Sequence, residues 1–147
     1  EHMITSWIHE AAVSSGEVVS ALSRAEVDTI IQLIRDRYTS QLSRSDTLWD
    51  GFENAQSLQD SNGWEIACMY PEEHPILIYR EGAEYRAFNM TSSRSLRLIL
   101  AGSPGFEFYV TNSEVTFVLC FNHHDYLIGV GNCASWLKHQ RPFGTTT

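Results

Sequence analysis

The sequence predicts an α+β domain, built on one mostly antiparallel sheet of about six strands with an N-terminal amphipathic helix, a mid-chain helix and a C-terminal helix. Two observations predict it. Apolar residues recur at helical spacing in the first quarter of the chain, and from Trp64 onward the pattern alternates with a period of two, as strands do. The strand-like runs are joined by short connections, which favours antiparallel pairing. A chain of 147 residues fits a single domain, 1–147.

Two helices are predicted before the sheet. Ser23 and Glu26 have the spacing of a capping box, in which each side chain bonds the backbone amide of the other residue. Apolar residues then recur at helical spacing, which predicts an amphipathic helix over 23–41. Residues 4–22 predict a shorter helix, interrupted near residues 14–16. Residues 42–63 are polar, acidic and poor in periodicity, so they predict a long acidic loop with one helical turn, and such loops tend to be functional.

Six strands are predicted in two groups of three. The first group should pair as an antiparallel meander, and a helix capped by Ser92 or Ser93 separates it from the second group. Run 106–112 alternates apolar and polar residues and is expected to be half exposed, whereas run 114–121 is apolar on both faces and is expected to be central. A closing helix begins near Asn132. The predicted strands are 64–70, 76–80 and 85–90, then 106–112, 114–121 and 126–130.

The charge of the chain limits the kind of partner. A formal net charge of −8 argues against nucleic acid or an anionic membrane, because both select a cationic surface. No apolar run approaches the roughly 20 residues of a membrane span. Residues 45–79 contain seven acids and no Lys or Arg, a charge of −7, and the remaining 11 acids and 10 bases leave −1. This window is either a solvated surface that favours solubility or a docking face that steers a basic partner.

The cysteines and the start of the chain indicate a cytoplasmic protein. Cys68, Cys120 and Cys133 are odd in number, lie far apart and form no C-x-x-C pair, which favours buried reduced thiols over a disulfide or zinc site. No charged n-region followed by an apolar h-region begins the chain, so a secretory signal is not indicated. Residues 1–2 are typical of a cloning remnant. No cofactor and no metal are expected.

The stretch FNHHDYLIGVGN at 121–132 contains the most conspicuous polar group of the chain, His123-His124-Asp125, between two predicted strands. Asn122 and Asp125 are turn residues, so a hairpin loop accounts for both. The histidines admit three interpretations: metal ligand, general base or partner contact. Adjacent histidines lack the i, i+4 spacing of a zinc-binding helix, and no nucleophile motif accompanies them, so partner contact is favoured.

Two further patterns have a structural and a functional interpretation. Gly129-Val-Gly131 follows a strand and precedes a helix, as a phosphate-binding turn does. A dinucleotide motif needs a third glycine and a further parallel strand, so a tight strand-to-helix turn is favoured. Trp49, Trp64 and Trp136 either line a ligand pocket or anchor the core, and the core is favoured.

The segments FEFYVTNSEVTFVLCFNHHDYLIGVG and CASWLKH resemble small bacterial proteins found beside polymorphic toxins and, more loosely, the immunity proteins of interbacterial toxin systems. The resemblance covers roughly residues 64–140 and carries no catalytic residue. It implies a cytoplasmic, non-enzymatic protein that binds one cognate bacterial toxin domain and neutralises it by occluding its active site. Toxins that act on nucleic acids or nucleotides often present basic clefts, to which the acidic window 45–79 is complementary.

An immunity-type toxin inhibitor is therefore the leading hypothesis. Acids in 46–60 together with 72–73 are expected to form the contact surface, because the connection at 81–84 lies at the other end of the intervening strand. Two alternatives stay open: a small soluble enzyme with His123 or His124 as general base, and a ligand-binding regulatory module. The predicted partner-binding residues are Asp46, Asp50, Glu53, Asp60, Glu72, Glu73, His123, His124 and Asp125.

Overall fold

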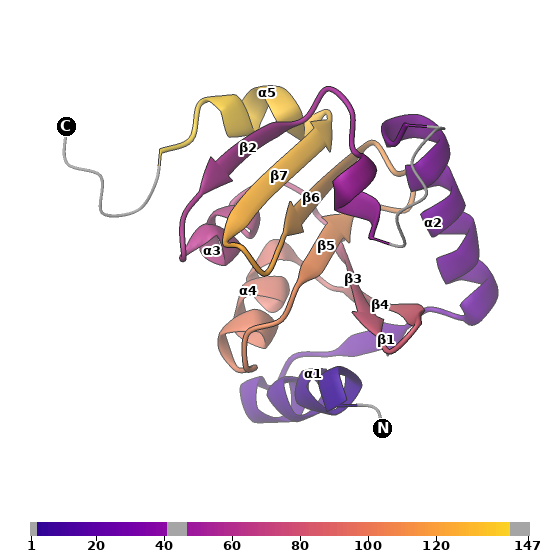
Figure 1. Cartoon of the computed structure of the whole chain (residues 1–147). Coiled ribbons are helices and arrows are strands. Elements are labelled where there is room, and N and C mark those ends of the chain that lie inside the picture. Colours follow the sequence, from indigo (N-terminus) through magenta and orange to yellow (C-terminus); the bar gives the residue numbers. More distant parts are fainter. Residues whose placement is uncertain (1–2, 41–46, 142–147) are drawn as a thin grey trace.

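The computed structural model describes residues 3–40 and 47–141, which fold into five α-helices, one 3-10 helix and one antiparallel sheet (Figure 1). The helices are α1 (Met3–Ser15), α2 (Arg24–Tyr38), the 3-10 helix η1 (Leu48–Gly51), α3 (Gly63–Ala67), α4 (Ser93–Ala101) and α5 (Cys133–Lys138). The strands are β1 (Val19–Ala21), β2 (Gln56–Gln59), β3 (Ile76–Glu81), β4 (Glu84–Met90), β5 (Phe108–Thr111), β6 (Phe117–Phe121) and β7 (Tyr126–Gly131). The predicted α+β class is confirmed, with helices near the N-terminus, in mid-chain and near the C-terminus.

The sheet of the described residues has seven strands rather than about six. Their order is β1-β4-β3-β5-β6-β7-β2, and every neighbouring pair is antiparallel. The five inner strands all come from residues 76–131, and α4 carries the chain from β4 to β5 on the other side of β3. The edge strands β1 and β2 come from earlier in the chain and pair with β4 and β7. Both edges of the sheet are therefore formed by strands from the first 59 residues, and the inner strands are formed by later residues.

Each face of the sheet has its own buried apolar cluster. Helices α1, α3, α4 and α5 pack on the first face, where Leu77 and Leu119 are buried. Helix α2 and η1 pack on the second face, where Ile78 and Val118 are buried (Figure 1). Successive side chains of a strand point to opposite faces, so a strand covered on both faces, such as β6, is apolar throughout. The predicted central strand with two covered faces is thus confirmed in β6.

Both predicted helix starts are confirmed. The Ser23 side chain accepts a hydrogen bond from the Glu26 amide at 3.2 Å, and the Glu26 carboxylate accepts one from the Ser23 amide at 2.8 Å, which completes the capping box of α2. The buried stripe of α2 consists of Val27, Ile30 and Ile34. Ser92 caps α4 by accepting a hydrogen bond from the amide of Ser95 at 3.1 Å. Helix α2 ends three residues before the predicted boundary of 23–41.

The predicted strand 64–70 is wrong, because residues Gly63–Ala67 form the short helix α3. Its buried residues are Gly63, Ile66 and Ala67, which share one helical face at spacings of three and four. Gly63 lies so close to the Phe121 ring that a Cβ would be 2.8 Å from its Cε1 atom. A run of seven residues is too short for periodicity to distinguish helix from strand. The predicted three-strand meander therefore reduces to the β3–β4 hairpin.

Both edge strands are absent from the prediction. The interval 42–63 contains the expected helical turn, as η1, but also strand β2 with the sequence QSLQ. Strand β1 lies within the interval 4–22, which was expected to be helical, and has only three residues. Neither strand buries a residue fully, so neither has the apolar alternation from which strands are predicted.

The second group of strands is more deeply buried than expected. All four residues of β5 are buried, although the alternation in 106–112 predicts an exposed face. The Tyr109 hydroxyl accepts a hydrogen bond from the Trp49 amide at 3.2 Å, so η1 covers the side expected to be solvated. Strand β6 begins at Phe117 because Val115 has a φ of 54°, which no regular strand residue adopts.

Candidate protein-binding surface

The candidate surface is built around the turn that joins β6 to β7. We call the end of the sheet with this turn the Asp125 end, and the opposite end, where β5 finishes, the Thr111 end. Residue Asn122 is only 3% exposed. Its Oδ1 atom accepts hydrogen bonds from the amides of His124 at 2.9 Å and Tyr126 at 3.0 Å. Asp125 has a φ of 62°, a conformation that Asp tolerates. The predicted hairpin turn is confirmed.

Glu107 joins this turn to η1. Its Oε1 atom accepts a hydrogen bond from the His123 amide at 3.1 Å and lies 2.9 Å from the His123 Nδ1 atom, while its Oε2 atom accepts one from the Trp49 Nε1 atom at 3.1 Å. The pairing of Phe108 with Phe121 brings Glu107, just before β5, beside the end of β6. Glu107 is not identified from the sequence, because only the pairing of β5 with β6 places it near His123, which is 16 residues later.

The two histidines pack on Trp49. The centroid of the Trp49 indole ring lies 6.1 Å from that of His123 and 6.3 Å from that of His124, and the two imidazole centroids are 3.9 Å apart. Both histidines are exposed and Trp49 is half-buried. The three rings and the Glu107 carboxylate therefore hold the turn in place, a structural role that the sequence does not indicate.

Three of the predicted acidic residues gather at the Asp125 end. The amide of Asp60, just after β2, donates a hydrogen bond to the Asp125 carbonyl at 2.9 Å. Asp50 follows Trp49 in η1 and is exposed, as is Asp125. Among the described residues, neither Asp50 nor Asp125 has an ion-pair partner. The structure thus places Asp50, Asp60 and Asp125 around the turn that carries His123 and His124.

The other predicted acids lie elsewhere. Glu72 and Glu73 precede β3 at the Thr111 end, about 10 Å from the Asp125 end along the three steps of β5. The Glu72 carboxylate accepts a hydrogen bond from the Asn112 amide group at 3.0 Å, which fixes it to the loop after β5. Asp46 lies outside the described residues. Glu72 and Glu73 therefore lie at the opposite end of the sheet from Asp50, Asp60 and Asp125, and a contact surface that joins 46–60 with 72–73 stays a prediction.

Part of the second face remains open over the outer strands β2 and β7. The side chains of Ser57 and Gln59 point to this face, because the intervening Leu58 packs on the first face. Both are exposed, and Tyr126 in β7 is 37% exposed. Figure 1 shows β2 and β7 side by side, with α2 and η1 lying over the inner strands. Exposed Glu53 lies where the chain passes from η1 to β2.

The histidines lie on an open surface and not in a cavity. Three hollows in the described part of the chain have volumes of about 340, 190 and 370 Å³, and none has His123 or His124 in its lining. Trp64 lines the second of these, Trp136 packs on the same sheet face, and Trp49 packs on the other face, so the tryptophans share no pocket. The described residues contain no group of three His, Cys, Asp or Glu side chains placed to hold a metal ion.

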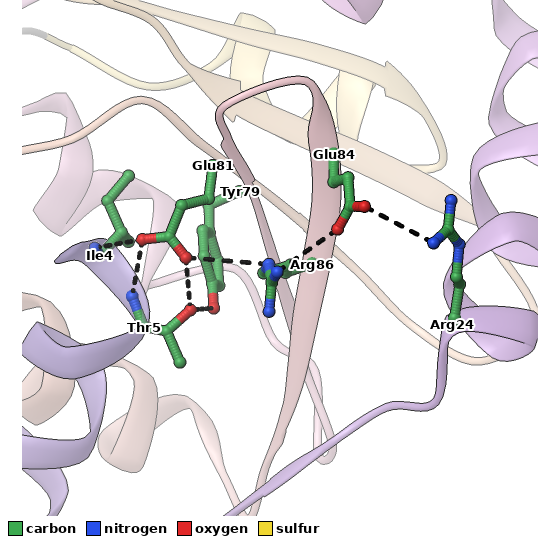
Figure 2. A network of polar contacts seen from close by, with 7 residues as sticks. All are labelled: Ile4, Thr5, Arg24, Tyr79, Glu81, Glu84 and Arg86. Carbon is green, nitrogen blue, oxygen red and sulfur yellow. Dashed lines mark hydrogen bonds and ion pairs between the residues drawn. The ribbon is translucent and has the colours of Figure 1, made fainter. Parts of the chain in front are cut away.

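The 340 Å³ hollow is a groove between α1, α2 and β4, with a polar network along its wall (Figure 2). Arg24, at the start of α2, and Arg86, in β4, are 3.5 and 3.3 Å from the Glu84 carboxylate between them. Figure 2 shows that this carboxylate links the two guanidinium groups. Because the carboxylates of Glu84 and Glu81 offset the two positive charges, the described residues of the groove present no free anion-binding pair, and the network joins α2 to the β3–β4 hairpin.

At the inner end of the network, Glu81 caps helix α1. Its Oε1 atom accepts hydrogen bonds from the amides of Ile4 at 2.5 Å and Thr5 at 3.3 Å, and its Oε2 atom accepts one from the Thr5 hydroxyl at 2.7 Å (Figure 2). The first turn of α1 has no acidic residue of its own, so Glu81 supplies the negative charge that favours a helix N-terminus. Burial raises the pKa of the Glu81 carboxyl, but the hydrogen bonds from Thr5 and Ile4 and the charge of Arg86 outweigh it, so this pKa is lower than usual.

The three cysteines are buried free thiols, as predicted. Burial raises the pKa of Cys68 and Cys133 to about 12, and it raises the pKa of Cys120 well above its ordinary value. The thiols stay protonated at neutral pH, and a protonated thiol is a poor nucleophile. The role of the three side chains is to pack in the hydrophobic core.

Gly131 is explained by close packing. It has a φ of 76°, and a Cβ there would lie 2.6 Å from the Thr116 carbonyl oxygen and 2.8 Å from the Tyr38 hydroxyl. Helix α5, which follows at Cys133, has only six residues. The favoured interpretation of the Gly-x-Gly sequence, a tight strand-to-helix turn, is confirmed.

In the described ranges, no helix is both long enough and apolar enough to cross a bilayer. Comparison of the chain with family models, with curated proteins and with solved structures gives no match. The functional proposal therefore rests on the residues of the surface and on their geometry.

Proposed function

We propose that this protein is an immunity-type inhibitor, which binds one basic bacterial toxin domain through the Asp125 end of its sheet and occludes the active site of that domain. The observation that carries the proposal is the concentration of exposed negative charge at this end. Exposed Asp125 belongs to the turn, exposed Asp50 and half-buried Asp60 lie beside it, and the chain between Arg44 and Arg80 contains no Lys or Arg. A surface of one sign accelerates association with a partner of the opposite sign.

The surface also has the apolar groups that tight binding requires. Interfaces derive most of their affinity from a few aromatic or Arg side chains, which are surrounded by polar contacts. Trp49 is half-buried and packs against the two histidines, and Tyr126 is 37% exposed on the open second face. Both belong to elements that are fixed by hydrogen bonds, Trp49 through Glu107 and Tyr126 through Asn122. A rigid surface loses less entropy on binding, which favours an inhibitor.

Co-expression with a toxin domain encoded beside the gene tests the proposal. The protein should form a complex with that domain and restore growth of cells that express it. Absence of both complex and rescue would refute the immunity function.

The contribution of the acidic residues is tested by charge reversal. The variant Asp50→Lys with Asp125→Asn should associate about tenfold more slowly with the toxin at low salt, and its rate should depend less on salt. The matched control is Glu10→Lys with Glu73→Gln, which makes the same change of net charge at exposed positions away from the Asp125 end. Equal rates for the two variants would contradict a role for the predicted surface.

A second candidate function is a small enzyme with His123 as general base. The observation that favours it is the carboxylate of Glu107 at 2.9 Å from the Nδ1 atom, an arrangement that orients catalytic imidazoles. His123→Gln distinguishes the two functions. If the protein neutralises the toxin by stoichiometric binding, a His123→Gln variant that still forms the toxin complex should still protect cells. If the protein is an enzyme, the same variant should form the complex but no longer protect cells.

A further inference from the structure

We propose that the outer edge of β2 binds an extended, basic segment of the partner, which adds to the sheet as an eighth strand. This inference rests on the proposed function and specifies how the partner is recognised. Strand addition uses backbone hydrogen bonds for affinity and alternate side chains for specificity, and it needs a sheet edge with unpaired backbone groups.

The register of the sheet determines which backbone groups are available at this edge. The amide of Asp60 donates to the Asp125 carbonyl, so these two residues form a hydrogen-bonded pair, and hydrogen-bonded pairs recur at every second position. Leu58 and Gln56 therefore bond to β7, opposite Leu127 and Gly129. The residues between them, Ser57 and Gln59, direct their amide and carbonyl groups away from the sheet.

These two residues are accessible to a partner. Ser57 and Gln59 are exposed, and the only side-chain bond of either in the described residues is a 3.5 Å contact from Gln59 Nε2 to the His124 carbonyl. An added strand would place alternate side chains over the open second face, beside Ser57 and Gln59. The other side chains would lie near Leu58, which packs on the first face.

Charge complementarity identifies the segment as basic. Exposed Glu53 lies three residues before β2, and Asp60 and Asp125 lie directly after it. Both ends of the edge are therefore acidic, and the chain that contains the edge has no Lys or Arg from 45 to 79. The basic residue Lys138 belongs to α5, which packs against β2 on the first face. A four-residue edge limits the added strand to four backbone hydrogen bonds, so Lys or Arg at the ends of the segment would supply much of its affinity.

A second copy of this chain is a poorer occupant. Antiparallel self-pairing of β2 would bring Glu53 of one copy towards Asp60 of the other at both ends of the new ladder. Like charges placed opposite each other on neighbouring strands are destabilising. Each copy also has a net charge of −8, which opposes association.

A peptide titration tests the edge without the toxin. The probe is a capped heptapeptide in which lysine alternates with valine, and the control peptide has glutamate in place of lysine. In ¹⁵N NMR spectra, the lysine peptide should shift the amide signals of Ser57 and Gln59 and slow their hydrogen exchange, whereas the glutamate peptide should not. Shifts confined to other residues would overturn the inference.

Proline variants identify the hydrogen bonds. Ser57→Pro removes an outward amide that the β2–β7 ladder does not use, so the fold should tolerate it while peptide affinity falls at least about fivefold. The matched control is Ala21→Pro, an outward position on the other edge strand, since the Leu22 amide bonds the Ala87 carbonyl. The control should bind the peptide as the wild type does. Equal affinity of wild type and Ser57→Pro would refute strand addition.

If Ser57→Pro fails to fold by circular dichroism, Glu53→Lys takes its place and should weaken the lysine peptide at low salt. Unchanged affinity would again overturn the inference.

Sedimentation tests whether a second copy of the chain occupies the edge instead. A wild-type dimer that Glu53→Lys strengthens would assign the edge to a second copy. The two proposals fail separately. A toxin complex that Ser57→Pro leaves intact refutes only strand addition, whereas absence of any toxin complex refutes the proposed function.

Discussion

Replacement of Glu81 by Gln should destabilise the fold by removing the charged cap of α1. The Glu81 side chain is only 9% exposed and accepts three hydrogen bonds from Ile4 and Thr5. Gln has nearly the same shape but no charge. Hydrogen bonds to charged groups contribute about 1.5–3 kcal/mol and neutral ones about 1 kcal/mol, and the charge at a helix N-terminus adds about 0.3–1 kcal/mol. We expect Glu81→Gln to cost about 2 kcal/mol, or about 4–8 °C in Tm.

Urea denaturation at pH 7 measures this loss, with Glu84→Gln as the matched control. Glu84 lies across the same hairpin but is 49% exposed and pairs with exposed Arg24 and half-buried Arg86, so its replacement should cost less than about 0.5 kcal/mol. Equal costs for the two variants would refute the capping role of Glu81.

The pH dependence provides a second test. The pKa of Glu81 is lower in the folded state than in the unfolded chain, so the unfolded state binds the proton more readily. The stabilisation is therefore fully present above the unfolded pKa, near 4.5, and is lost as the pH falls through the folded pKa. The stability gap between wild type and Glu81→Gln should stay constant from about pH 7 to 5 and narrow below it. A gap that persists at pH 3 would contradict the electrostatic explanation.

Three further predictions concern the core and the turn. The native protein should react with a thiol reagent far more slowly than the protein in urea, where all three cysteines should react; fast labelling of the folded protein would contradict their burial. Gly131→Ala should cost more than about 2 kcal/mol, because its Cβ would meet the Thr116 carbonyl oxygen, while Gly82→Ala, with a φ of 63° but open space around it, should cost about 1 kcal/mol in the same urea assay. Asn122→Ala should cost about 1–3 kcal/mol and broaden the NMR signal of the His124 amide, which loses its acceptor; an unchanged Tm would exclude a structural role for Asn122.

The parts of the fold that the sequence predicts are those with a strong local signal. The capping box of Ser23 and Glu26 sets the start of α2, and the apolar alternation of β3, β4, β6 and β7 locates four strands. Strand β2 has no such signal, because the sheet edge leaves most of its side chains in water. The burial of Tyr109 was not predictable from its own strand either, since it depends on a hydrogen bond from Trp49, sixty residues earlier.

The candidate surface was predicted in part. Asn122 and Asp125 identify the turn because their backbone preferences are local. Glu107 was missed, since its contact with His123 exists only when β5 pairs with β6. The sequence does not show at which end of the sheet Glu72 and Glu73 lie relative to the histidines, because this depends on the pairing of β3 with β5 and of β5 with β6.

The pairing of the two early edge strands with later strands has a consequence for synthesis on the ribosome. Strand β2 pairs with β7, whose Gly129 is opposite Gln56, and β1 likewise pairs with the later strand β4. At about 5–20 residues per second, the partner of β2 is synthesised roughly 4–15 seconds after β2 itself. Until β3 and β4 have been synthesised, the apolar stripe of α2 has no sheet to cover. The growing chain therefore remains incomplete until β7 has left the exit tunnel, and a chain that stalls before this point would present α2 and unpaired β2 to chaperones and proteases.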